Sequence, residues 1–305
     1  FAGGNVAYDA MLLDIAERDE LERLSARGFA LGYLGGGLLF ALNVAMVLQP
    51  EWFGLADKAE AVRVAFLSVA VWWAVFTVPV LVFVKSPERD KARHSPGWSH
   101  AWQELMISWR LLRSLPNAFV FLLAYWCYID GVDTIVRMAV DYGLSIGFEA
   151  DGLLTALLVT QFVGFPAALV FGRIGDRMGA KGAIWLAIGV YVLVVVWAAN
   201  MSETWEFYGL AVMIGLVQGG VQAMSRALFA RLIPAEHAGR LFGLYNMMGK
   251  FAAILGPVLV GWVALASDSS RLGILSILLL FIAGAILLSR VDVAQGEADA
   301  QRVAA

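Results

Sequence analysis

Residues 172–184 read GRIGDRMGAKGAI and lie between two apolar runs of the chain. Glycine permits a sharp reversal of the backbone, and an acidic side chain can accept from the N–H groups that begin a neighbouring helix. Basic side chains at such a turn can pair with acids or with lipid phosphates. An incidental order of charges in an ordinary turn is the competing interpretation, but the length and order of the pattern favour a defined gate loop. Its expected functional residues are Gly172, Asp176, Arg177, Gly179 and Lys181.

The composition places the chain among membrane proteins. Of its 305 residues, 60% are hydrophobic and 15% are charged, whereas soluble domains average about 45–50% apolar and about 25% charged residues. The net charge of −3 offers no basic surface for nucleic acid. Cys127 is the only cysteine, so a disulfide framework is excluded. The histidines, His94, His100 and His237, fall in polar segments without forming a cluster, and we expect neither a metal site nor a cofactor.

Apolar runs along the chain are long enough to cross a membrane. A spanning helix needs about 20 apolar residues to cross roughly 30 Å of hydrocarbon. Eight runs meet this length: 27–48, 64–84, 117–141, 152–172, 182–200, 205–229, 241–266 and 272–290. Most connections are short, and the exceptions are 49–63 and the charged segment 85–116. The runs predict an all-α membrane protein.

The basic residues of the loops predict the orientation. If segment 85–116 is cytoplasmic, seventeen lysines and arginines, with Arg226 counted among them, fall on the cytoplasmic side. Only Lys58, Arg63 and Arg271 fall on the other side, and Arg137 and Lys250 lie within spans. This bias follows the positive-inside rule. We therefore expect a multi-pass protein whose segment 85–116 and C-terminus are cytoplasmic.

The long segment 85–116 divides into two parts. Residues 85–97, KSPERDKARHSPG, are polar and contain two prolines, as a flexible linker would. Residues 98–113 predict an amphipathic helix, because one helical stripe carries Trp98, Trp102, Leu105, Trp109 and Leu112. Tryptophan favours the membrane interface, so we expect this helix to lie there. The alternative is an ordinary helix packed on the inner face of the protein.

The gate loop resembles the loop signature of the major facilitator superfamily, in its second-half copy between helices eight and nine. The resemblance implies a major-facilitator-type helical bundle, with twelve helices in two six-helix halves. Residues 1–84 would then be the remainder of the first half, with the end of helix four in 1–13 followed by helices five and six. Residues 85–116 would form the central loop, 117–290 the second half and 291–305 a cytoplasmic tail. Eight complete helices, five to twelve, are expected, in a chain truncated at its N-terminus.

Longer segments resemble one branch of that superfamily, the vacuole effluxers and their bacterial relatives. They are GFALGYLGGG (28–37), YIDGVDTIVRMAVDYG (128–143), QFVGFPAALVFGRIGDRMGAK (161–181), GLVQGGVQAMSRALFARLIP (215–234) and FGLYNMMGKFAAILGP (242–257). Leu13 departs from the pattern, which has a proline after helix four. The branch's fungal members are associated with export of amino acids from the vacuole, which implies an amino-acid substrate. A bacterial inner membrane is expected rather than a vacuolar one.

Glycines recur every four residues in the first long run, at Gly28, Gly32 and Gly36. Small residues at this spacing let helix backbones approach closely in lipid. In the superfamily, helix five meets helix eight across the two halves, so these glycines could form a sliding contact. Tight packing within one half is the alternative. The resemblance also implies that Asp176 caps the start of helix five, near residues 25–28, when the cytoplasmic side is closed.

Residues 122–143, LLAYWCYIDGVDTIVRMAVDYG, carry four charges within an apolar run. A charge at the bilayer centre costs about 2.5–3.5 kcal/mol and needs partners or water. The helical rise of 1.5 Å per residue places Asp130 and Asp133 deep, Arg137 near the outer edge and Asp141 in water. Lys250 lies at a depth close to that of Asp130. We expect Asp133 to pair with Arg137 at i, i+4, and Asp130 to pair with Lys250 across a cavity.

These charges suggest a central substrate site, since transporters of this kind bind near the membrane midplane. Lys250 or Arg137 would hold a carboxylate, and Asp130 or Asp133 would hold an ammonium group or a proton. The expected site comprises Asp130, Asp133, Arg137, Lys250, Gln161, Gln218, Gln222, Asn246 and Tyr125.

The favoured function is secondary active transport of a small solute, such as an amino acid, by alternating access, with proton coupling as an option. Its partners would be the solute and the lipid bilayer, and the protein is expected to be monomeric. A membrane scaffold or receptor with a structural charge network is the alternative. An enzyme is not expected, because no Ser/His/Asp set or phosphate loop appears. Asp130 and Asp133 also share one helix, whereas aspartyl proteases oppose two carboxylates from different segments.

Overall fold

The computed structural model describes residues 2–83, 98–145, 147 and 150–304, and these residues form helices joined by turns and short irregular segments. The predicted linker 85–97 lies outside them. The helices are α1 (Ala2–Ala10), α2 (Leu12–Ile15), α3 (Leu21–Leu48), α4 (Lys58–Phe83), α5 (Trp98–Arg113), α6 (Pro116–Ser145), α7 (Ala150–Asn200), α8 (Thr204–Arg231), α9 (Ala238–Ser267), α10 (Ser270–Ser276), α11 (Leu278–Ser289) and α12 (Val293–Ala304). Two short 3-10 helices are η1 (Pro50–Phe53) and η2 (Ala235–His237).

Seven helical segments of the described chain are long and apolar enough to cross a membrane. They confirm the predicted all-helical membrane fold, although the sequence predicted eight runs. The difference arises in α7, which is a single element of 51 residues. At 1.5 Å per residue it would be about 76 Å long, far more than the roughly 30 Å of one crossing.

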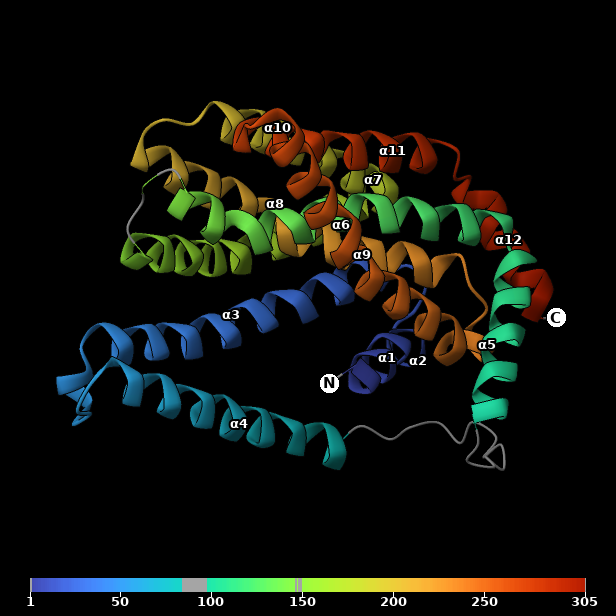
Figure 1. Ribbon diagram of the computed structural model, residues 1–305. Coiled ribbons are helices and arrows are strands. Elements are labelled where there is room, and N and C mark those ends of the chain that lie inside the picture. The colour runs from blue at the N-terminus through green and yellow to red at the C-terminus, as the bar shows by residue number, and fades with distance from the viewer. Residues whose placement is uncertain (1, 84–97, 146, 148–149, 305) are drawn as a thin grey trace.

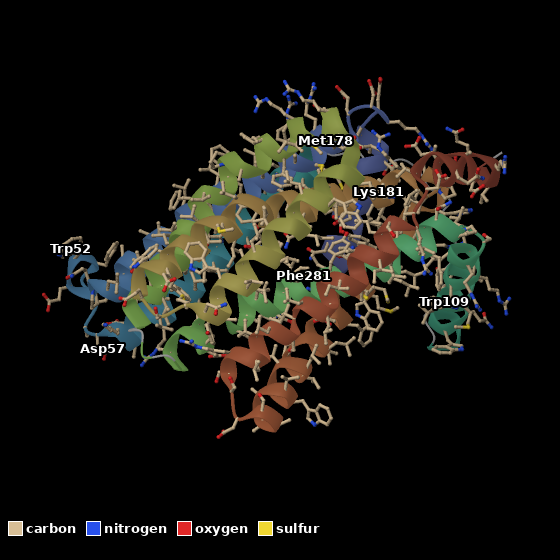
Figure 2. All side chains as sticks on the ribbon, turned by 90° about the horizontal axis from the view of Figure 1, so that it is seen from above. Trp52, Asp57, Trp109, Met178, Lys181 and Phe281 are labelled. Atoms are coloured by element: carbon tan, nitrogen blue, oxygen red, sulfur yellow. The ribbon has the colours of Figure 1, made fainter. Side chains whose placement is uncertain are left out.

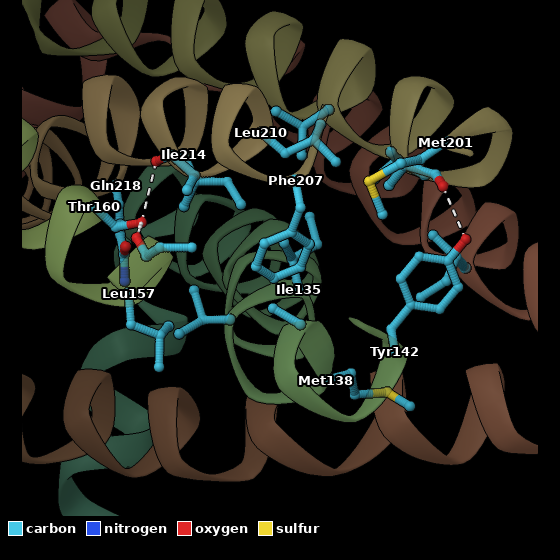
Figure 3. A pocket seen from close by; sticks show the side chains of 18 residues that line it. Ile135, Met138, Tyr142, Leu157, Thr160, Met201, Phe207, Leu210, Ile214 and Gln218 are labelled. Carbon is cyan, nitrogen blue, oxygen red and sulfur yellow. Dashed lines mark hydrogen bonds between the residues drawn. The ribbon is translucent and has the colours of Figure 1, made fainter. Parts of the chain in front are cut away.

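Helix α7 turns back on itself at Gly179. This glycine has φ 74° and ψ 158°, a conformation that is essentially restricted to glycine. One small apolar pocket is lined by Leu157 and Thr160 before the turn and by Val194 and Ala198 after it. Figure 3 shows this pocket, with side chains of α6 and α8 closing it. The two arms of α7, 150–178 and 180–200, therefore lie side by side. The numbering of the spans as helices five to twelve remains a prediction.

The helices pack into one group, with α3 and α4 along one side of it. Helix α7 packs on α8, α6 packs on α9 and α11, and α3 packs on α7 and α8. Helix α4 contacts α3, and in Figure 1 this pair lies below α6, α7 and α8. The spanning stretch of α4 buries none of its residues in the protein. Its exposed apolar side chains, such as Phe66, Leu81 and Phe83, suit contact with hydrocarbon.

Helices α5 and α12 lie at the end of the bundle that carries Gly179, which we call the Gly179 end. Figure 1 shows α5 running across this end of α6. Figure 2 places Trp52 and Asp57, in the connection from α3 to α4, at the end opposite Lys181 and Trp109. The bundle thus has two ends with different structures.

The protein covers only part of the apolar stripe predicted for α5. Leu112 is fully buried, and the ring of Trp109 packs edge-on against Phe119 at 5.7 Å. Arg240 of α9 also forms an ion pair with Glu104 at 3.1 Å. Trp102, by contrast, is 63% exposed. The alternative of a helix packed on the protein therefore describes the C-terminal part of α5, and Trp102 remains available to the membrane interface.

The predicted packing glycines of α3 differ from one another in their surroundings. A methyl group built on Gly32 would meet no atom within 4 Å, because Gly32 borders a cavity. A tight contact beside it is made by Tyr33 of α3, whose ring lies between Gly164 of α7 and Gly219 of α8. A methyl group would lie 2.7 Å from the ring on Gly164 and 2.8 Å from it on Gly219. Close approach between α3 and its neighbours therefore depends on glycines of the neighbours and on Gly28 of α3, where a methyl group would lie 3.3 Å from Arg226 Nη2 of α8.

Replacing Gly164 by alanine is expected to lower the free energy of unfolding by about 1–3 kcal/mol, the usual cost of overpacking. The ring of Tyr33 cannot move away, because Gly219 confines its other side. Unfolding of the detergent-solubilised protein would measure the change. Gly32→Ala is the matched control and should cause no loss. Equal losses in both variants would contradict this account of the contact.

Candidate functional site

A cavity of about 350 Å³ lies between α1 and α3 on one side and α6, α8 and α9 on the other. We call it the charged cavity. Its lining carries carboxylates, basic groups, amides and phenols, and it comprises Asn5, Tyr8, Asp9, Phe29, Tyr125, Ile129, Asp133, Gln222, Arg226, Tyr245, Asn246, Gly249 and Lys250. A site with charges of both signs can bind a zwitterionic solute.

A second cavity of about 630 Å³ adjoins the charged cavity, and the two share Asn5, Tyr8 and Phe29. Gln161 of α7 and Gln218 of α8 line this second cavity. Gly28 and Gly32 form the α3 wall beside them. The glycines of α3 therefore leave space next to the polar side chains.

The structure gathers most of the predicted site residues around these two cavities. Five of them, Tyr125, Asp133, Gln222, Asn246 and Lys250, line the charged cavity. Asp133 interacts electrostatically with both Arg137 and Lys250. Arg137 itself is exposed, and neither it nor Asp130 is among the described residues that line the two cavities.

Asp130 does not have the partner expected from its depth. Its Oδ1 accepts a hydrogen bond from the N–H of Gly256 at 2.9 Å and a longer one from Thr134 Oγ1 at 3.4 Å. Asp130 is fully buried, and its Oδ2 has no hydrogen-bond partner among the described residues. Gly256 precedes Pro257, and proline disturbs the helix turn before it. The expected pair of Asp130 with Lys250 is therefore replaced by a contact that joins α6 to the distorted turn of α9.

Two other residues, Asp9 of α1 and Arg226 of α8, form a buried ion pair in the charged cavity. Arg226 Nη1 lies 3.3 Å from Asp9 Oδ1, and the second oxygen of Asp9 accepts from Asn246 Nδ2 at 2.8 Å. Arg226 also donates from Nε to Ser25 Oγ at 2.9 Å. The positive-inside count places Arg226 on the cytoplasmic side, whereas the structure buries its guanidinium inside the bundle.

Charged contacts connect α3 to the other helices at the Gly179 end. Asp176 accepts from Arg23 Nη2 at 2.7 Å and from Nε at 3.1 Å. The expected backbone cap is thus replaced by a side-chain pair in the first turn of α3. Arg231 of α8 forms a bidentate pair with Glu22 of α3 at 2.6 and 2.7 Å, and it contacts Glu297 of α12 at 3.2 Å.

The other gate-loop residues also have identifiable contacts. Lys181 donates to the carbonyls of Ser289 and Val291, at 3.2 and 2.7 Å, where α11 ends. A cation suits that end of a helix, because the unpaired carbonyls carry negative charge. Gly172 allows close approach to α3, since a methyl group there would lie 2.9 Å from Ala26 Cβ. Arg173, Arg177 and Met178 are exposed. The loop therefore binds both α3 and α11.

Residues 9–301 match the family described as vacuole effluxer Atg22 like. The chain belongs to this family. An uncharacterised MFS-type transporter of Bacillus subtilis, YxiO, is 36% identical over 308 aligned positions, which cover 98% of this chain and 71% of YxiO. Autophagy-related protein 22 of Yarrowia lipolytica is 25% identical and is covered over 55% of its length. The chain spans about half the length of the fungal relatives that it matches.

The fold of this Atg22-like chain resembles that of the fucose:proton symporter FucP of E. coli. The two structures align with a TM-score of 0.60 over 94% of this chain and 73% of the symporter, at 16% identity. The similarity confirms a major-facilitator type of fold. Together with the family match, it confirms the resemblance inferred from the gate loop and the longer motifs. The chain is a multi-pass membrane protein of the transporter class.

Sequence reasoning missed several charged residues of the Atg22-like chain. Arg226 lies within the apolar run 205–229, so its position inside a predicted span was the available signal. Asp9 lies in the apolar segment FAGGNVAYDAMLL, where a single carboxylate is equally unusual. Glu22 and Glu297 gave no comparable signal, because both stand in charged surroundings. Their role depends on which helix ends meet Arg231.

Proposed function

We propose that this Atg22-like chain forms part of a secondary active transporter that moves a small solute, an amino acid, by alternating access. The charged cavity is the observation that carries the proposal. It lies between α1 and α3 on one side and α6, α8 and α9 on the other, and it presents groups of both signs. YxiO is named as an MFS-type transporter and FucP as a proton symporter, so the transporter class has support from relatives.

Alternating access requires that the site open to one side of the membrane at a time. The charged contacts at the Gly179 end join α3 to α7 and α8, and α8 to α12, and they are suited to hold that end closed. The large number of basic residues there supports a cytoplasmic location for this end, in a bacterial inner membrane. Asp133 lines the cavity together with Lys250. As the carboxylate at this position, Asp133 would bind the solute's ammonium group or a proton.

The test is uptake of labelled amino acids by the full-length protein in proteoliposomes. Asp133→Asn is expected to lower uptake about tenfold or more, because a lost hydrogen bond to a charged group costs about 1.5–3 kcal/mol. Asp141→Asn makes the same chemical change on the same helix, at an exposed position outside both cavities, and should leave uptake unchanged.

The uptake measurements test the assigned site and the proposed function separately. Equal uptake by Asp133→Asn and wild-type protein would contradict the assigned site. If the wild-type protein takes up no amino acid and none raises its melting temperature, the proposed function is wrong, and the charges have a structural role only.

A further inference from the structure

Arg226 is an unusually enclosed cation. Its side chain is 4% exposed, although it lines the charged cavity. Besides the bond from Nε to Ser25, its Nη2 donates to the carbonyl of Ser25 at 3.3 Å. The guanidinium lies over the rings of Tyr8 and Phe29, at 4.8 and 5.1 Å from their centroids. These contacts hold the guanidinium in one orientation. A guanidinium is the side-chain group best suited to recognise a carboxylate.

A carboxylate of the chain itself occupies the position facing Arg226. Asp9 contacts Arg226 Nη1 through one oxygen and Asn246 Nδ2 through the other. The two donors come from α8 and α9, and both residues line the cavity. A guanidinium and an amide that bind the two oxygens of one carboxylate form a complete receptor for this group.

The Asp9 contact is weaker than a structural ion pair of the same molecule. Arg231 binds Glu22 with two nitrogens, at 2.6 and 2.7 Å. Arg226 contacts Asp9 with one nitrogen at 3.3 Å, beyond the range of about 2.7–2.9 Å typical of charge-assisted bonds. The Arg231 contact is a two-nitrogen fork that joins α8 to α3, whereas the Arg226 contact is a single and longer one.

We propose that Arg226 and Asn246 bind the carboxylate of the transported solute, and that Asp9 occupies this position when the solute is absent. The inference rests on the proposed function and names the group of the solute, its free carboxylate, that these two residues recognise. Exchange of one carboxylate for another keeps Arg226 paired, so no buried cation is left uncompensated. Arg226 thereby takes the role that the sequence suggested for Lys250 or Arg137.

The experiment is solute exchange in proteoliposomes containing the full-length protein, with each of the twenty proteinogenic amino acids and its carboxamide. Exchange needs no ion gradient, so it reports on binding and translocation alone. We expect the amino acids to exchange and the carboxamides to exchange at least about tenfold more weakly. Arg226→Lys should raise the half-saturating concentration about tenfold, because lysine cannot reproduce the guanidinium fork.

Asp9→Asn provides the readout that a structural role would not produce. The asparagine keeps the size of Asp9 and removes the competing charge, so the half-saturating concentration of the exchanged amino acids should fall about threefold to tenfold. A rise or no change would overturn the exchange model, because a fixed partner of Arg226 cannot be lost with a gain in affinity. Carboxamides that exchange as well as amino acids would overturn the carboxylate assignment and leave transport standing. Wild-type protein that exchanges nothing would overturn both proposals.

Discussion

Replacing Arg231 by alanine is expected to lower the free energy of unfolding by about 3–5 kcal/mol, the usual cost of removing one partner of a buried ion pair. Glu22 is 3% exposed, and both of its oxygens are bound by Arg231. The substitution leaves this carboxylate buried without its cation. It also releases Glu297 of α12. Equilibrium unfolding of the solubilised protein would measure the loss.

Two further variants test whether the buried charge causes this loss. Arg23→Ala breaks the nearby pair with Asp176, in which the side chains are 54% and 21% exposed, and should cost no more than about 1 kcal/mol. The double variant Glu22→Gln, Arg231→Met removes both charges and should recover most of the stability, because no unpaired ion remains. A double variant as unstable as Arg231→Ala would show that the loss comes from packing instead.

The sequence predicted the helical membrane fold well, because apolar runs must be long enough to cross the hydrocarbon. It also predicted a reversal within residues 172–184, which the structure places at Gly179, since few residues other than glycine adopt that backbone conformation. It could not be predicted which part of the apolar face of α5 packs on the protein and which part stays exposed. Periodicity identifies the apolar face of a helix but cannot say whether protein or lipid covers it.

The site was predictable in its position and only partly in its pairings. Depth along a helix follows from the rise per residue, and it placed Asp133 and Lys250 around one cavity. The direction in which a side chain points around the helix axis depends on tertiary packing. Asp130 therefore binds the backbone of Gly256 instead of Lys250. The Asp9–Arg226 pair could not be predicted, because it depends on the approach of helices separated by 217 residues in the chain.

Replacing Gly256 by alanine is expected to lower the free energy of unfolding by about 3 kcal/mol or more, at the upper end of the usual cost of overpacking. A methyl group on Gly256 would overlap Thr134 Oγ1 and lie 2.8 Å from Asp130 Oδ1. These atoms belong to α6, so the new methyl group would push α6 away from α9. The hydrogen bond from Gly256 to the buried Asp130 would be strained or lost at the same time.

Gly261→Ala is the matched control for this variant, because it lies in the same helix and a methyl group there would meet no atom within 4 Å. It should leave stability unchanged or raise it by about 0.5–1 kcal/mol, the helix preference of alanine over glycine. Thr134→Ala removes the overlapping hydroxyl, so adding it to Gly256→Ala should restore part of the loss. Equal stability of the two single glycine variants would mean that α6 and α9 can separate freely at this point. The contact of Asp130 with Gly256 would then not be what holds these helices together.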